Sequence, residues 1–70
     1  MNDYQPAKVK WFNRARGFGF ITRGKNTPDI FVHMAVLRTC GINGLQPAQK
    51  VAVKSTTGPK GELATEVKLK

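Results

Sequence analysis

The segments GFGFI (residues 17–21) and IFVHM (residues 30–34) decide which fold this chain can adopt. Side chains in a β-strand point alternately to its two faces, so Phe18 and Phe20 would share one face, opposite Ile21. The second segment also has an aromatic side and an aliphatic side. A small barrel has a single interior, so one apolar face of each strand must meet solvent, and a group of exposed rings is typical of a binding surface.

The rest of the chain has the same β-type pattern. Apolar residues recur at every second position, and Gly or Pro interrupts them about every eight to twelve residues. This pattern predicts five strands, at residues 7–13, 17–23, 29–33, 48–55 and 62–69. The long connection at residues 34–47 is the exception, and residues 34–38 within it are expected to form one helical turn.

The length of the chain limits the architecture. Its 70 residues allow one domain, residues 1–70, with the barrel at about 7–69. Five short strands without a long helix fit an OB-like or SH3-like barrel, because closure removes the exposed sheet edges. A two-sheet sandwich usually needs about seven strands. The fold class is therefore predicted as all-β.

Alternation also indicates which face is inside. Aliphatic side chains that could fill the barrel occur in all five predicted strands, whereas the rings gather on two neighbouring strands, with His33 beside Phe31. We therefore expect the aromatic face to be exposed. The predicted inner set is Val9, Ile21, Ile30, Val32, Val51, Val53, Val67 and Leu69.

The charge of the chain indicates what would cover that face. Twelve Lys and Arg against four Asp and Glu give a formal charge of +8, which favours polyanions, with nucleic acid first and acidic membrane surfaces second. Aromatic rings interleaved with basic residues are the pattern of single-strand binding, because rings stack on unpaired bases while cations hold phosphates. We expect single-stranded RNA or DNA as the partner.

Composition argues against several other classes. A single cysteine, Cys40, cannot form an internal disulfide, which favours a reducing compartment and hence the cytoplasm. The sequence has neither a secretory start nor an apolar run long enough for a membrane span. One His and one Cys are too few ligands for a structural zinc site, and the few scattered acids give little basis for catalysis. We expect a monomer without enzyme activity, cofactor, metal or small-molecule substrate.

Three spaced motifs resemble a known family. KWFN at residues 10–13, RGFGFI at 16–21 and DIFVH at 29–33 are similar to the cold-shock domain, and the resemblance covers about residues 7–69, including the GPKG turn at 58–61. It implies a five-stranded antiparallel OB-type barrel with a long loop between strands 3 and 4. It also implies binding of single-stranded RNA and DNA, often as an RNA chaperone that keeps strands unpaired.

The resemblance also implies a set of binding residues. Carried over position by position, these are Lys10, Trp11, Phe12, Arg16, Phe18, Phe20, Asp29, Phe31, His33 and Lys60. Many family members have an aromatic residue directly after the His and another in the long loop, where this chain has Met34 and Ile42. Both are kept as candidate contacts, although they should hold a base less well than Phe does.

Some roles stay open at this stage. Phe12 has the opposite parity to Trp11 unless the strand bulges, so it is either an edge ring of the binding face or a core residue. Asp29 either orders the preceding turn or accepts a hydrogen bond from a base. The remaining basic residues, including Arg14 and Arg38, have the plain interpretation of solvated charge. The alternative function is a protein-interaction barrel that uses the same aromatic patch.

Overall fold

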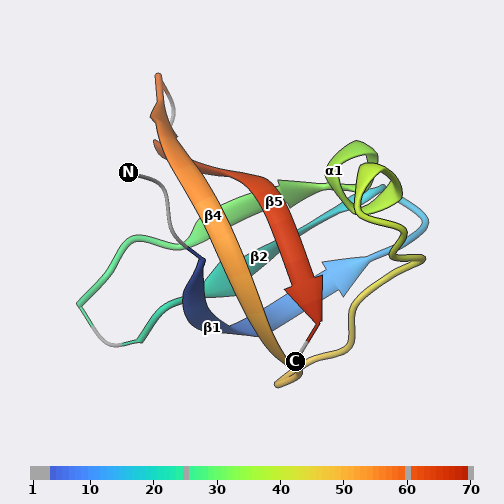
Figure 1. Ribbon diagram of the computed structural model, residues 1–70, viewed down its shortest axis with the longest axis horizontal. Coiled ribbons are helices and arrows are strands. Elements are labelled where there is room, and N and C mark those ends of the chain that lie inside the picture. The colour runs from blue at the N-terminus through green and yellow to red at the C-terminus, as the bar shows by residue number, and fades with distance from the viewer. Residues whose placement is uncertain (1–3, 25, 60, 70) are drawn as a thin grey trace.

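The computed structural model describes residues 4–24, 26–59 and 61–69, which form five strands and one short helix (Figure 1). In chain order these are β1 (Gln5–Asn13), β2 (Phe18–Thr22), β3 (Ile30–His33), α1 (Met34–Thr39), β4 (Lys50–Gly58) and β5 (Gly61–Leu69). All five predicted strands and the helical turn are therefore confirmed. No helix in these ranges is long and apolar enough to cross a membrane.

The strands close into a barrel in the order β1-β2-β3-β5-β4. Strand pairs β1–β2, β2–β3, β1–β4 and β4–β5 are antiparallel, but β3 and β5 pair in parallel. A closed ring with an odd number of strands cannot alternate direction at every junction, so at least one pair must be parallel. The all-β OB-type barrel is confirmed, with this correction to its antiparallel description.

The barrel interior contains the predicted aliphatic residues with one exception. Leu69 was expected inside, but it is 49% exposed because it lies at the last position of β5, at the edge of the barrel wall. The residues confirmed as buried are Val9, Ile21, Ile30, Val32, Val51, Val53 and Val67. The opposite, ring-bearing face of β2 and β3 is therefore the outer one.

The start of β4 also differs from the prediction. It was expected at Ala48 but lies at Lys50, because the preceding residues form a turn. Ala48 has a positive φ of 66°, and the Gln49 N–H donates to the Gln46 carbonyl at 3.1 Å. At its other end β4 continues to Gly58, since it pairs with β5 along the whole hairpin.

An irregularity in β1 decides where its aromatic residues point. The register against β2 shifts between Val9 and Trp11, so Lys10 is an extra residue. Such a bulge lets consecutive residues share a face. Val9 is buried, Lys10 and Trp11 are exposed, and Phe12 returns to pack against the core.

Candidate nucleic-acid interface

Four aromatic rings from three neighbouring strands form one cluster on the outer face of the barrel. Trp11 of β1 lies 5.6 Å from Phe18 and 5.4 Å from Phe20, measured between ring centroids. Phe31 of β3 lies 5.6 Å from both phenylalanines of β2. Each ring therefore contacts two others, so the four rings form one continuous cluster. We call these four residues the aromatic patch.

Strand register brings the patch together. Phe20 is paired with Trp11 on one side and with Phe31 on the other, while Phe18 faces His33 across β2 and β3. Directly paired residues point to the same face, so the bulge in β1 is what brings Trp11 onto it. Trp11 is 39% exposed, and the three phenylalanines are partly exposed.

Gly19 allows β1 and β2 to approach under the patch. A Cβ atom at this position would overlap the Trp11 carbonyl oxygen and lie 2.6 Å from Cδ1 of Phe12. Only glycine fits such an approach without moving the neighbouring strand. The glycine between the two phenylalanines therefore has a structural reason, which is to bring Trp11 close to them.

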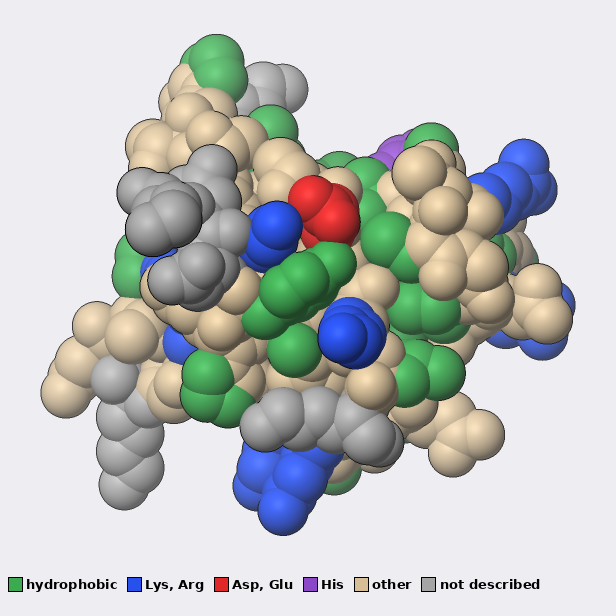
Figure 2. Space-filling view, in the orientation of Figure 1, with side chains coloured by type: hydrophobic (Ala, Val, Ile, Leu, Met, Phe, Trp, Pro, Cys, Tyr) green, Lys and Arg blue, Asp and Glu red, His purple; other side chains and the backbone are tan. Residues whose placement is uncertain are grey.

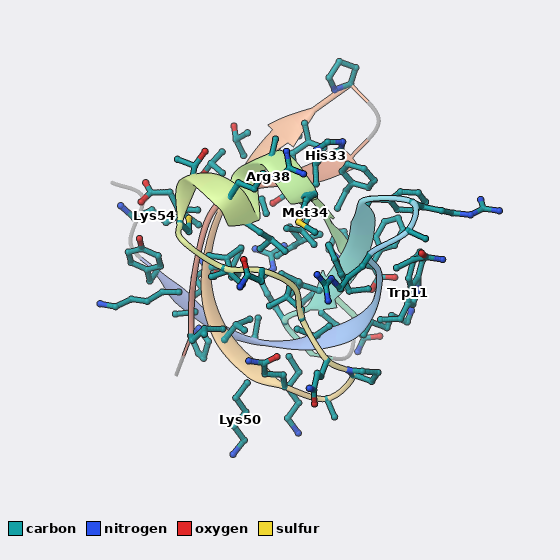
Figure 3. All side chains as sticks on the ribbon, turned by 90° about the vertical axis from the view of Figure 1, so that its right-hand side faces the viewer. Trp11, His33, Met34, Arg38, Lys50 and Lys54 are labelled. Atoms are coloured by element: carbon teal, nitrogen blue, oxygen red, sulfur yellow. The ribbon has the colours of Figure 1, made fainter. Side chains whose placement is uncertain are left out.

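His33 is exposed at the edge of the patch, where β3 passes into α1. Its Nδ1 accepts a hydrogen bond from the Ala35 N–H at 3.0 Å and so caps the helix. In the neutral ring this places the proton on Nε2, which is left as a donor for a base or phosphate oxygen. Figure 3 shows His33 and Trp11 on the side of the barrel away from Lys54.

Basic residues border the patch, but they differ in what they contact. Lys10 forms an ion pair with Asp29 at 2.9 Å between Nζ and Oδ2, so Asp29 holds a cation at the patch. An exposed pair like this contributes little to stability. Arg16 is exposed, and its backbone N–H donates to Oδ1 of Asn13 at 3.0 Å. The sequence left two roles open for Asp29, ordering the preceding turn or binding a base, and its ion pair with Lys10 is neither of these.

Two candidate residues lie on the core side of this region. Phe12 is half-buried, packs against the core and, among the described rings, makes none of the pairs of the patch. Met34 also packs against the core at the start of α1, while its N–H donates to the Gly17 carbonyl at 2.8 Å. The structure thus favours the core interpretation of Phe12.

Ile42 departs from the expectation that it faces a base, because it is only 7% exposed and belongs to the core. The end of α1 explains this. The Ile42 N–H donates to the Leu37 carbonyl, and the Gly41 N–H donates to that of Arg38, with Gly41 at a φ of 75°. This is a Schellman motif, in which the residue after the left-handed one packs against the helix. The signal, an apolar residue after Gly, was present in the sequence.

Lys60 lies outside the described residues. Leu63 of β5 was not singled out, yet it is 37% exposed and directly paired with Phe31, so it extends the apolar surface of the patch. Only the parallel β3–β5 pairing brings these residues together, and nothing local in the sequence signals it. No group of His, Cys, Asp or Glu suited to a metal occurs in the described ranges.

A closed five-stranded barrel with half-exposed rings and basic side chains on one face has the construction of an OB-type nucleic-acid-binding domain. The comparisons agree with this class. The family model for the 'Cold-shock' DNA-binding domain matches residues 5–70, and the chain therefore belongs to the cold-shock domain family. It is a nucleic-acid-binding protein and not an enzyme.

Similar proteins cover nearly the whole chain. A cold shock-like protein CspA from Stigmatella aurantiaca is 47% identical over 60 residues, covering 86% of this chain and 88% of the relative. Cold shock-like protein CspE of Escherichia coli K12 is 44% identical over 59 residues, which cover 84% and 86%. The major cold shock protein CspA of Pseudomonas aeruginosa is 44% identical over 69 residues, 99% of each chain.

Proposed function

We propose that this protein binds single-stranded RNA and DNA with low sequence specificity and acts as an RNA chaperone. The observation that carries the proposal is the aromatic patch, in which four partly exposed rings lie side by side on the outer face. Every base has a flat π-face, so stacking on such rings is tolerant of sequence. Lys10, Arg16 and His33 border the patch and would contact phosphates and base edges.

Chaperone activity follows from differential affinity. The patch can stack only on bases that are unpaired, so binding shifts a weak hairpin toward its open form. The size of the shift is set by the difference in affinity between the two forms, and nucleotide hydrolysis is not required. Basic side chains release counterions from the strand, so affinity should fall as salt rises.

The same proposal includes the state of the protein. We expect it to act as a monomer in the cytoplasm, without a cofactor or a small-molecule substrate. The free thiol of Cys40 supports a reducing compartment. A mass measurement in solution that showed a stable dimer would contradict the monomer.

Tryptophan fluorescence tests the proposal directly, because the single tryptophan of the chain, Trp11, lies in the patch. Short single-stranded oligonucleotides should quench its emission, and blunt duplexes of the same sequence should do so far less. Raising the salt should weaken the response. If single strands leave the emission unchanged while a protein partner shifts it, the patch is a protein-interaction surface.

A further inference from the structure

A hollow of about 320 Å³ lies beside the aromatic patch, between the β1–β2 turn and α1. Arg14 and Arg16 line it from the turn, Arg38 lines it from the helix, and His33 lies between it and the patch. Its volume is at the lower end of the ~300–1,000 Å³ typical of ligand sites. Figure 3 shows Arg38 and His33 next to one another above Met34.

The walls of this hollow are held in place by backbone hydrogen bonds. The Gly17 N–H donates to the Asn13 carbonyl at 2.8 Å, which closes the turn that carries Arg14 and Arg16. The Gly17 carbonyl then accepts from the Met34 N–H at 2.8 Å and joins the turn to the start of α1. The two sides are therefore positioned before any ligand arrives, which lowers the entropic cost of binding.

The arginines of the hollow have no carboxylate partner among the described residues. The acids in these ranges are engaged elsewhere, since Asp29 pairs with Lys10, Glu62 with Arg23 and Glu66 with Lys54. Three arginines therefore line one hollow, and none of the described carboxylates neutralises them. The planar guanidinium donates paired hydrogen bonds that fit the oxygens of a phosphate.

The lining favours a phosphate over a stacked base as the main ligand. The described part of the hollow contains Met34 and no aromatic ring except that of His33. The donors available are the arginines and Nε2 of His33, whose other nitrogen is used in the helix cap. This chemistry matches a phosphate rather than a base.

We propose that the hollow binds a phosphate of the nucleic-acid strand that is held on the aromatic patch. This phosphate belongs to the nucleotide that follows the one in contact with His33. The proposal rests on the function proposed above and assigns Arg14 and Arg38 to the path of the strand. Arg14 also packs along Gly44, since a Cβ there would lie 3.0 Å from its Cδ. Arg38 is exposed and makes no such contact in the described structure, so it is the residue to vary.

The test compares Arg38→Gln with Lys50→Gln, which removes the same charge at the far end of the barrel from Arg38 (Figure 3). Both variants are titrated with single strands of about four to eight nucleotides, lengths within the range of OB-fold sites. Arg38→Gln should leave the affinity for the shortest strand nearly unchanged and lower that for the longest about three- to tenfold, as for one exposed charge-assisted contact. It should also reduce the salt slope by about 0.7.

Two sets of strands, without and with terminal phosphates, distinguish an internal phosphate from a terminal one. A loss seen with strands that lack terminal phosphates assigns the hollow to an internal phosphodiester, and a loss confined to strands with a 5′ or 3′ phosphate assigns it to a chain end. Either result supports the proposal. Equal losses in Arg38→Gln and Lys50→Gln at every length overturn it. A different result would show that the proposed function itself is wrong. In that case Phe31→Ala would leave the affinity for even the shortest strand unchanged, and the inference about the hollow would fail with it.

Discussion

The two broad faces of the barrel both place aromatic rings beside basic side chains, yet they are different kinds of surface. On the β4–β5 face, Figure 2 shows hydrophobic, basic and acidic side chains in contact. There the ring of Tyr4 lies 4.8 Å from Nζ of Lys54 and 5.7 Å from that of Lys68. Its hydroxyl donates to Glu66 at 2.9 Å, and this hydrogen bond raises the pKa of Tyr4 above 10.0.

On the opposite face, the rings of the aromatic patch contact one another, and Asp29 is the one carboxylate that the described ion pairs place beside them. Residue type therefore does not by itself make a binding site. Around Tyr4 the donors, acceptors and charges are matched within the protein, so little is left for a ligand. At the patch the ring faces are partly exposed and Arg16 has no described carboxylate partner, although Lys10 pairs with Asp29. We expect a nucleic acid to supply the missing partners.

The largest effect is expected from Gly19→Ala, which should separate the strands under the patch. The added Cβ would meet backbone of β1, which cannot rotate away, so the variant should lose about 3 kcal/mol of unfolding free energy. Denaturant unfolding measures this. Gly17→Ala is the matched control, since its Cβ would find Met34 Cβ at an ordinary 3.7 Å and its positive φ should cost only about 1 kcal/mol. Equal losses would contradict the close approach.

The next prediction compares the two faces directly through Phe31→Ala and Tyr4→Ala. Loss of a stacking ring should weaken oligonucleotide binding by about 1–3 kcal/mol. Tyr4→Ala should leave binding almost unchanged, because its ring already lies against two lysines of the chain and its hydroxyl is bonded to Glu66. Fluorescence titration measures both affinities, and circular dichroism checks that each variant is folded. Similar losses in the two variants would remove the distinction between the faces.

The smallest effect concerns Glu62, which lies where β5 meets both β4 and β3. The hydrogen bond from Thr57 lowers the pKa of Glu62 most, with further contributions from Ser55 and from the charge of Arg23 at 3.6 Å. A carboxyl whose pKa is lowered by folding stabilises the protein above its ordinary value of 4.5, and this contribution is lost as the pH falls through the folded pKa.

Unfolding free energy should therefore fall more steeply in the unmodified protein than in Glu62→Gln between about pH 5 and pH 3. The other carboxyl groups titrate in both proteins, so the difference between the two curves isolates Glu62. Urea unfolding across this range provides the measurement. Parallel curves would show that the contacts of Glu62 do not persist in solution.

Much of the patch was predictable because it depends on local alternation. Phe18 and Phe20 are two residues apart on one strand, and Phe31 shares a face with His33 on the next, whereas the pairing of Phe31 with Phe20 is seen only in the structure. Phe12 could not be placed in this way, since its direction depends on a bulge that the pattern does not reveal. Leu63 could not be found either, because its neighbour on the patch is far away in sequence.

The sequence alone determined that the chain forms a small all-β barrel, which strand faces are aliphatic and which aromatic, and that its charge favours a polyanion. These properties follow from the period of two along each strand and from composition, and neither needs contacts between distant residues. Tertiary structure decided the rest, including the parallel pairing of β3 with β5, the burial of Ile42 and the placement of Arg14 and Arg38 around one hollow. Those features arise where separate segments pack together, and local pattern holds no information about which segments meet.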